Sequence, residues 1–219
     1  MLKGMKTMYV AKMPGTTIVA QIEKDGADKM LTPMFYSGGL VLSQVTQITG
    51  LEGYIIQNWV KRKYLTPPES KKYSRCQLCH ILNINVLKEC FTFEQTEIIL
   101  NYISNALKSE ETGFSFDDNN LYSCFINALS KLLSDGGGIT VLEAGNSKKR
   151  LELDIERIHR AVSTAVSEYA ETLEESGIGT IPSALQKRLN DVLRIMVTSY
   201  EALEIKNKVV DLYSQLDFK

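Results

Sequence analysis

Residues 40–88 read LVLSQVTQITGLEGYIIQNWVKRKYLTPPESKKYSRCQLCHILNINVLK, and this stretch decides the fold. Its apolar spacing predicts a helix over residues 42–49, with Ser43 as the capping residue, and a second helix that starts near Gly53. Gly50 stands between the two, where a helix can end in the left-handed backbone conformation that glycine adopts at no steric cost. The predicted order is therefore helix, tight turn, helix.

The second helix has two chemically different faces. Ile56, Trp59 and Val60 lie on one face at helical spacing. The opposite face carries Tyr54, Gln57, Asn58, Lys61 and Arg62. In the major groove of DNA, Gln and Asn can pair with adenine, and Arg or Lys with guanine. An ordinary amphipathic surface helix has the same two faces, so this helix alone does not separate DNA binding from simple packing.

Prolines and basic residues follow the second helix. Pro67 and Pro68 end the helical run and impose an extended path, residues 71–73 predict a short return strand, and Ser74 can cap a third helix. Residues 54–75 contain six basic residues and one acidic residue, Glu69. The local charge is therefore +5, in a chain of net charge −1. The basic residues are Lys61, Arg62, Lys63, Lys71, Lys72 and Arg75. This concentration is typical of phosphate contact, and the order of elements predicts a winged helix-turn-helix.

The runs TQITGLEGYIIQNWVKRKYLTPP and KKYSRCQL resemble the MerR-type DNA-binding domain. They are more similar still to an uncharacterised bacterial family of MerR-like transcription regulators, through IQNWVKR at residues 56–62 and KKYS at residues 71–74. The later run LRIMVTSYEALEIKNKV, residues 193–209, extends the resemblance over most of the chain. The resemblance implies a MerR-like fold and DNA binding. It supplies neither an operator nor an effector.

From the pattern and the resemblance together we expect residues 54–62 to form a recognition helix in the major groove. We expect a short basic wing, residues 68–73, on the phosphates. The expected DNA contacts are Tyr54, Gln57, Asn58, Lys61, Arg62, Lys63, Lys71, Lys72, Tyr73 and Arg75. Two departures stand out: Lys63 occupies the position of a helix-ending glycine, and the wing is several residues shorter than in typical MerR proteins.

The rest of the chain divides into an N-terminal arm, residues 1–39, and a helical domain, residues 116–219, which flank the DNA-binding domain over residues 40–108. We expect a helix over residues 93–108, a polar break at residues 109–113, and a helix over residues 118–133. Asp117 should cap that last helix, and the glycines at residues 136–138 should end it. The glycines lack the Gly-Lys-Ser/Thr of a phosphate loop.

From about Lys149 the chain is strongly helical. The first predicted seam comprises Leu151, Ile155, Ile158, Val162, Ala165, Tyr169 and Leu173. After the break at residues 177–179, Pro182 opens a second long helix, whose apolar face is broadened by Leu193 and Val197. The two predict a long antiparallel helical hairpin that packs on a third element or another subunit. The predicted fold class is thus mostly α, with a MerR-like winged helix-turn-helix before an all-helical C-terminal region.

Cys76, Cys79 and His80 spell the C-x-x-C-H of covalent haem attachment. That chemistry needs export, and the sequence predicts no export signal. As a zinc site the motif offers at most three ligands, and His159 is the only other histidine. We interpret the cysteines as packing residues beside a core stripe and predict no metal and no cofactor. With no catalytic constellation in the sequence, we predict that the protein is not an enzyme.

Composition limits the remaining possibilities. The chain has 219 residues, of which 44% are hydrophobic, enough for a proper core. Without a signal peptide or a membrane-length apolar run, we expect a cytoplasmic protein with no membrane partner. The expected partners are double-stranded DNA and a second copy of the chain, paired through the C-terminal hairpin or the helix over residues 93–108. A small-molecule or protein effector on the helical domain stays open. The alternative function is a helical protein-interaction module that has kept the winged fold.

Overall fold

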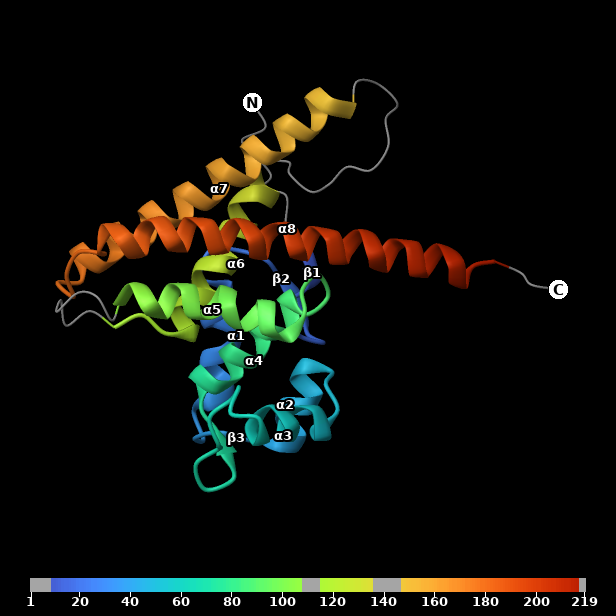
Figure 1. Ribbon diagram of the computed structural model, residues 1–219, viewed down its shortest axis with the longest axis vertical. Coiled ribbons are helices and arrows are strands. Elements are labelled where there is room, and N and C mark those ends of the chain that lie inside the picture. Colours follow the sequence, from blue (N-terminus) through green and yellow to red (C-terminus); the bar gives the residue numbers. More distant parts are fainter. Residues whose placement is uncertain (1–8, 108–114, 136–146, 217–219) are drawn as a thin grey trace, which may run out of the picture.

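The computed structural model describes residues 9–107, 115–135 and 147–216, and the part it describes is mostly helical, which confirms the predicted class at that level. Figure 1 shows two long helices at one end and a group of short helices and strands at the other. In chain order the elements are β1 (Val10–Lys12), β2 (Val19–Gln21), α1 (Gly26–Leu31), the 3-10 helix η1 (Thr32–Phe35), β3 (Leu40–Val41), α2 (Leu42–Thr49), α3 (Gly53–Lys61), β4 (Lys72–Tyr73), α4 (Arg75–Leu87), α5 (Phe93–Leu107), α6 (Asp118–Ser134), α7 (Ser147–Glu175) and α8 (Ser183–Ser214).

The turn between α2 and α3 forms as its sequence predicts. Gly50 has φ +70° and its N–H donates to the carbonyl of Thr46 at 2.8 Å. A Cβ at this position would lie 3.0 Å from the Thr17 side chain, so space as well as backbone conformation favours glycine. The predicted cap is wrong: Val41 precedes α2, and its N–H donates to Gln44 Oε1 at 3.0 Å. Ser43 already lies inside the first turn.

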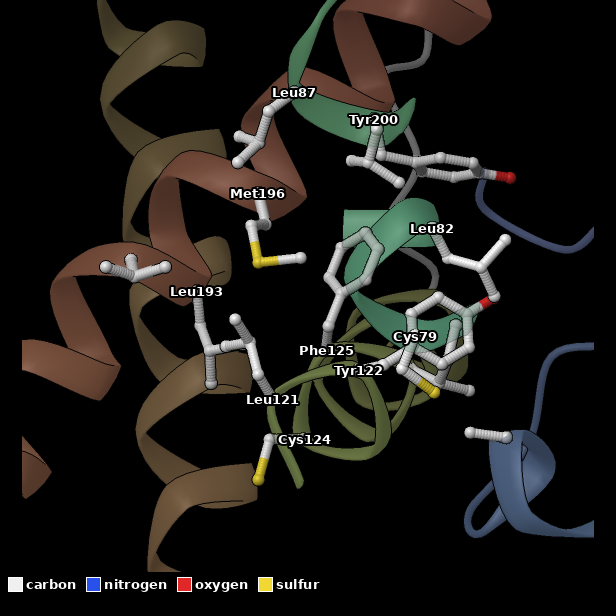
Figure 2. Close-up of a cluster of buried hydrophobic side chains, with 14 of the residues drawn as sticks. Cys79, Leu82, Leu87, Leu121, Tyr122, Cys124, Phe125, Leu193, Met196 and Tyr200 are labelled. Carbon is white, nitrogen blue, oxygen red and sulfur yellow. The ribbon is translucent and has the colours of Figure 1, made fainter. Parts of the chain in front are cut away.

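Helix α4 forms the centre of the core. Its stripe of Leu78, Ile81, Leu82 and Leu87 is fully buried, and the helix contacts α2, α6 and α8. The predicted cap is confirmed, because Ser74 Oγ accepts a hydrogen bond from the N–H of Gln77 at 3.2 Å. Figure 2 shows where three helices meet, with side chains from α4 (Cys79, Leu82, Leu87), α6 (Leu121, Tyr122, Cys124, Phe125) and α8 (Leu193, Met196, Tyr200).

Helices α7 and α8 pack against each other and against α6, and α8 also covers α4 and α5. The broad apolar face of α8 is explained by these several neighbours, which bury both Leu193 and Val197. On α7 the predicted seam is buried at Ile158, Val162, Ala165 and Leu173 and half-buried at Tyr169, whereas Ile155 is 44% exposed. Asp117 caps α6 as predicted, since Oδ1 accepts from the N–H of Asn119 at 2.9 Å.

Residues 9–35 pack on the body of the molecule. β1 and β2 pair as an antiparallel hairpin in which Val10 lies opposite Gln21. Hydrogen bonds then tie this segment to α4 and α6: Asn85 Nδ2 donates to the carbonyl of Gly15 at 2.7 Å, and the Tyr122 hydroxyl donates to the carbonyl of Pro14 at 2.8 Å.

Some predicted features fall outside the described residues. They are the polar break at residues 109–113 and the glycine stop at residues 136–138. Among the helices that are described, none combines the length and the apolar composition needed to cross a membrane.

Candidate nucleic-acid interface

The expected DNA-contact residues gather at one end of the molecule. Helix α3 and the loop over residues 66–71 lie at the end opposite α7 and α8 (Figure 1). The loop returns as β4, which pairs antiparallel with β3, so that Leu40 faces Tyr73 and Val41 faces Lys72. Gly39 makes this approach possible, because a Cβ there would lie 2.8 Å from the carbonyl oxygen of Tyr73.

The inner face of α3 is held firmly. Ile56 is fully buried and Trp59 is 7% exposed, as their spacing predicts. The ring of Trp59 lies 5.6 Å from that of Phe93, the first residue of α5, and the ring of Tyr64 lies 4.1 Å from the same Phe93. Helix α3 is therefore fixed from behind by aromatic contacts with the start of α5.

The outer face of α3 and the tip of the loop are open to solvent. The exposed members of the expected set are Tyr54, Gln57, Asn58, Lys61, Arg62, Lys63, Lys71 and Lys72. In the part of the chain that the structure describes, no ion pair involves Lys61, Arg62, Lys63, Lys71 or Lys72. Other basic side chains form ion pairs, among them Lys29 with Glu23 and Lys131 with Glu168. The exposed cations at this end therefore keep their charge available for an external anion.

Two of the expected contacts point elsewhere. Tyr73 is 3% exposed, and burial raises the pKa of its phenol, so its ring belongs to the core and not to the exposed surface of the loop and β4. Arg75 forms an ion pair with Asp28, and its Nη1 donates to Thr32 Oγ1 at 3.1 Å. Its side chain is thereby directed to α1. We therefore remove Tyr73 and Arg75 from the set of candidate contacts.

A tight turn presents the tip of the loop. Ser70 and Lys71 have φ of +49° and +65°, and the N–H of Lys72 donates to the carbonyl of Glu69 at 2.8 Å. Two central residues with positive φ are the pattern of a type I′ hairpin turn, which usually contains Gly or Asn. The turn carries Lys71 at its tip at some cost in backbone strain.

Gln77, which the sequence reasoning did not single out, fixes the base of this loop. Its Nε2 donates to the carbonyls of Thr66 and Pro67 at 2.8 Å and 3.0 Å, while its Oε1 accepts from the N–H of Ser74 at 2.8 Å. The only local signal is the Ser-x-x-Gln spacing of a capping box, which predicts the bond to Ser74 but not the bonds to the loop.

Helix α3 ends with Lys63 in the left-handed conformation, at φ +65°. The N–H of Lys63 donates to the carbonyl of Val60 at 3.0 Å, and the N–H of Tyr64 donates to the carbonyl of Trp59 at 2.9 Å. These two bonds make a Schellman motif, in which Lys63 stands at the position that glycine usually occupies. The turn is therefore built in the usual way, with the conformational cost that a side chain brings.

The His80 side chain contacts both the segment that follows α3 and the first residue of α6. Its Nε2 lies 3.0 Å from the carbonyl oxygen of Tyr64 and its Nδ1 lies 3.0 Å from Asp118 Oδ2. Burial by itself would lower the pKa of the imidazole, but the hydrogen bond and charge of Asp118, together with the Tyr64 carbonyl, outweigh it and raise the pKa. This contact was not expected, because His80 and Asp118 are separated by 38 positions in the sequence and no local pattern predicts it.

The C-x-x-C-H motif lies within α4. Cys79 is fully buried, and burial, followed by the charges of Asp117 and Asp118, raises the pKa of the Cys76 thiol to about 11. Thiols in such surroundings stay protonated and make poor metal ligands. Across the described residues, no group of three or more His, Cys, Asp or Glu side chains is placed to hold a metal ion.

The comparisons with known proteins give one match. The model of a family described as Domain of unknown function (DUF1836) matches residues 37–125, which run from just before β3 to the middle of α6. The match covers less than half of the chain and carries no stated function. No curated protein and no solved structure matches the chain.

Proposed function

We propose that this chain is a DNA-binding transcription regulator with a MerR-like winged helix-turn-helix. In this proposal α2 and α3 are the helix-turn-helix, α3 with Arg62 is the recognition helix, the loop over residues 66–71 with β4 is the wing, and α4 is the third helix. The resemblance of residues 46–78 to the MerR-type domain supports the assignment. So does the observed order of strand β3, helix, turn, helix, strand β4 and helix, in which β3 and β4 pair with each other.

One observation carries the proposal: within the described part of the chain, the five basic side chains exposed at this end of the molecule form no ion pair. Charges that serve only solubility are usually interspersed with acids, as they are on α7 and α8. Here Lys61, Arg62 and Lys63 end the helix that also presents Gln57 and Asn58. Amide groups flanked by cations suit a major groove, where the amides read adenine while the cations bind phosphate or guanine.

The DNA-bound species in this proposal is a homodimer. Two recognition helices in a symmetric dimer would lie about 34 Å apart, one turn of B-DNA. The long α7–α8 hairpin is the candidate for pairing, because α8 extends beyond the body (Figure 1) and carries apolar side chains that are 56–64% exposed near its end. They are Val209, Val210, Leu212 and, just past the helix, Leu216.

The test is fluorescence anisotropy of the purified chain with its own upstream DNA and with a scrambled duplex, over a salt series. Five phosphate contacts per chain predict a log–log slope of about −4.5 for each chain bound. We expect Lys71→Glu combined with Lys72→Glu to weaken binding to both duplexes and to reduce the slope by about 2 per chain. Gln57→Ala should instead reduce the preference for one sequence over the other.

The matched control is Lys12→Glu combined with Lys187→Glu, which changes the net charge equally at two exposed positions outside both the basic end and the exposed apolar end of α8. It should leave DNA binding nearly unchanged. Equal binding of every duplex by the wild type and all variants would overturn the proposal. Sedimentation of the complex gives the number of chains per duplex, and a single chain would remove the homodimer from the proposal.

The second candidate function is a protein-interaction module, favoured by the exposed apolar end of α8. In that case the winged part is retained for packing, and the basic end has no nucleic-acid partner. The two functions differ in one measurement, since only the first predicts salt-dependent binding of a duplex at low ionic strength.

A further inference from the structure

One ionisable side chain, His80 of α4, contacts the segment that ends helix α3. The Tyr64 carbonyl oxygen, which lies 3.0 Å from His80 Nε2, belongs to the residue that closes the Schellman motif of α3. The N–H of the same Tyr64 donates to the carbonyl of Trp59 at 2.9 Å. Residues 61–63, directly before Tyr64, carry three of the five exposed basic side chains that form no ion pair in the described part of the chain. His80 therefore acts on the segment that presents these charges.

The other ring nitrogen of His80 contacts a carboxylate that is anchored in the body of the molecule. Nδ1 lies 3.0 Å from Asp118 Oδ2, and Asp118 Oδ1 accepts a hydrogen bond from Asn83 Nδ2 at 3.0 Å. Asp118 is the first residue of α6, a helix that packs on α4, α7 and α8. Tyr64, in contrast, lies in the connection between α3 and β4. Of the two oxygens that face the ring, the Tyr64 carbonyl is thus the one that can move more easily.

The number of protons on the imidazole decides whether both contacts can persist. With a proton on each nitrogen, the ring donates to the carboxylate and to the carbonyl at the same time. After the loss of one proton a single N–H remains, and the charged carboxylate is the stronger acceptor for it. The lone pair of Nε2 then faces the lone pairs of the Tyr64 carbonyl oxygen, which is a repulsive contact. Deprotonation therefore loosens the end of α3 and preserves the contact with Asp118.

The ionisable groups around the ring favour its charged form. Burial is the largest effect and lowers the pKa of the imidazole, but the hydrogen bond and charge of Asp118, a backbone carbonyl and the charge of Glu97 on α5 together raise it. Glu97 and Lys63 line the same cavity of about 150 Å³ as His80. Cys76, one turn earlier on α4, stays protonated, because burial raises the pKa of its thiol to about 11. The His80 side chain is 25% exposed, so solvent can exchange its protons.

We propose that His80 makes DNA binding pH-sensitive: the imidazolium holds the end of α3 in the position that contacts DNA, and deprotonation weakens binding. This inference rests on the DNA-binding function proposed above and adds a proton-linked control to it. His80 is a positioning residue here, because it acts through Tyr64 on residues 61–63. Linkage is reciprocal, so if the protonated protein binds DNA more tightly, bound DNA must also raise the pKa of the imidazole.

The experiment is fluorescence anisotropy of the full chain with its own upstream DNA, at fixed ionic strength, between pH 5.5 and pH 8.5. His80→Gln keeps a polar side chain but cannot carry the charge. We expect the variant to bind more weakly than the wild type at pH 5.5 and almost equally at pH 8.5. The ratio of the two Kd values should therefore fall at least about fivefold over this range. Far-ultraviolet circular dichroism at each pH gives the folded fraction by which each Kd is corrected.

His159→Gln is the matched control, because His159 is the other histidine of the chain and lies exposed on α7. This variant should follow the wild-type pH profile. A second readout is nuclear magnetic resonance of the imidazole of His80, which should titrate at a higher pH with DNA bound than without it.

Two failures can be told apart. A constant ratio of the Kd values of wild type and His80→Gln from pH 5.5 to pH 8.5, or the same titration of His80 with and without DNA, would refute the pH control and leave the DNA-binding function standing. Absence of binding to any duplex at every pH would refute both.

Discussion

At the scale of single residues, the protonation of His80 affects the stability of the fold directly. Both of its nitrogens face oxygen acceptors, the Tyr64 carbonyl and the Asp118 carboxylate, and only the imidazolium can donate to both. Its pKa is raised in the folded state, mainly because Asp118 outweighs the burial that would lower it. The contact therefore stabilises the fold fully below the ordinary pKa of histidine, and the contribution is lost as pH rises through the raised value.

We predict that His80→Gln costs about 1–2 kcal/mol of unfolding free energy near pH 5.5 and less near pH 8.5. The measurement is urea unfolding at both pH values. Glu201 titrates in the same window, because burial and then Asp154 raise its carboxyl pKa to about 7. That group also weakens the fold as pH rises, but it is common to variant and wild type and cancels in the difference.

The control for this prediction is His159→Gln, at an exposed histidine of α7, which should cost little at either pH. An equal cost of His80→Gln at pH 5.5 and pH 8.5 would show that the imidazolium is not the stabilising form.

At the scale of the elements, the end of α3 combines two properties in one side chain. Lys63 is a member of the unpaired basic group and also the left-handed residue of a Schellman motif. We predict that Lys63→Gly raises the unfolding free energy by about 0.5–1 kcal/mol, since glycine adopts positive φ without a Cβ penalty. The same change should weaken DNA binding and reduce the salt slope by about 1 per chain.

Lys63→Ala is the matched control for that variant. It removes the same charge but keeps a Cβ, so it should weaken DNA binding without the gain in stability. Thermal unfolding and the anisotropy series measure the two effects separately. Equal stability of the glycine and alanine variants would argue against strain at this turn.

Helices α2 and α3 were predictable from the sequence because their signals are local. Apolar spacing marks the buried Val45, Ile56 and Trp59, and Gly50 marks the turn. The direction of Tyr73 was not predictable. It lies on a two-residue strand whose inward face is set by pairing with β3, more than thirty residues earlier. The direction of the Arg75 side chain likewise depends on its contact with Asp28, and no residue near Arg75 in the sequence predicts that partner.

At the scale of the whole molecule, the family match and the hydrophobic core have different limits. The match covers residues 37–125, but the buried cluster also includes Met13, Ile22 and Leu31 from the N-terminal segment and Leu193 and Met196 from α8. A fragment of residues 37–125 would leave α4 and α6 without these covers. The division of the chain into three domains therefore stays a prediction from the sequence. In the structure, one buried cluster contains residues from all three segments.

We predict that the fragment of residues 37–125 does not fold alone, since it would expose the apolar faces of α4 and α6. Proton–nitrogen correlation spectra of the fragment should show little dispersion. Residues 9–216 serve as the control and should give a dispersed spectrum. A dispersed spectrum for residues 37–125 would show that this segment is an independent folding unit.

The packing of the N-terminal segment has a consequence for the order of events during translation. Asp25 forms a hydrogen bond with Asn127, 102 residues later in the chain, and Pro14 forms one with Tyr122, 108 residues later. Lys12 forms one with Tyr200, 188 residues later. At usual ribosomal speeds of about 5–20 residues per second, a delay of 100 residues is roughly 5–20 s. These particular bonds therefore form only after α6 and α8 have been synthesised, and until then we expect Met13 and Leu31 to be open to chaperones that bind apolar side chains.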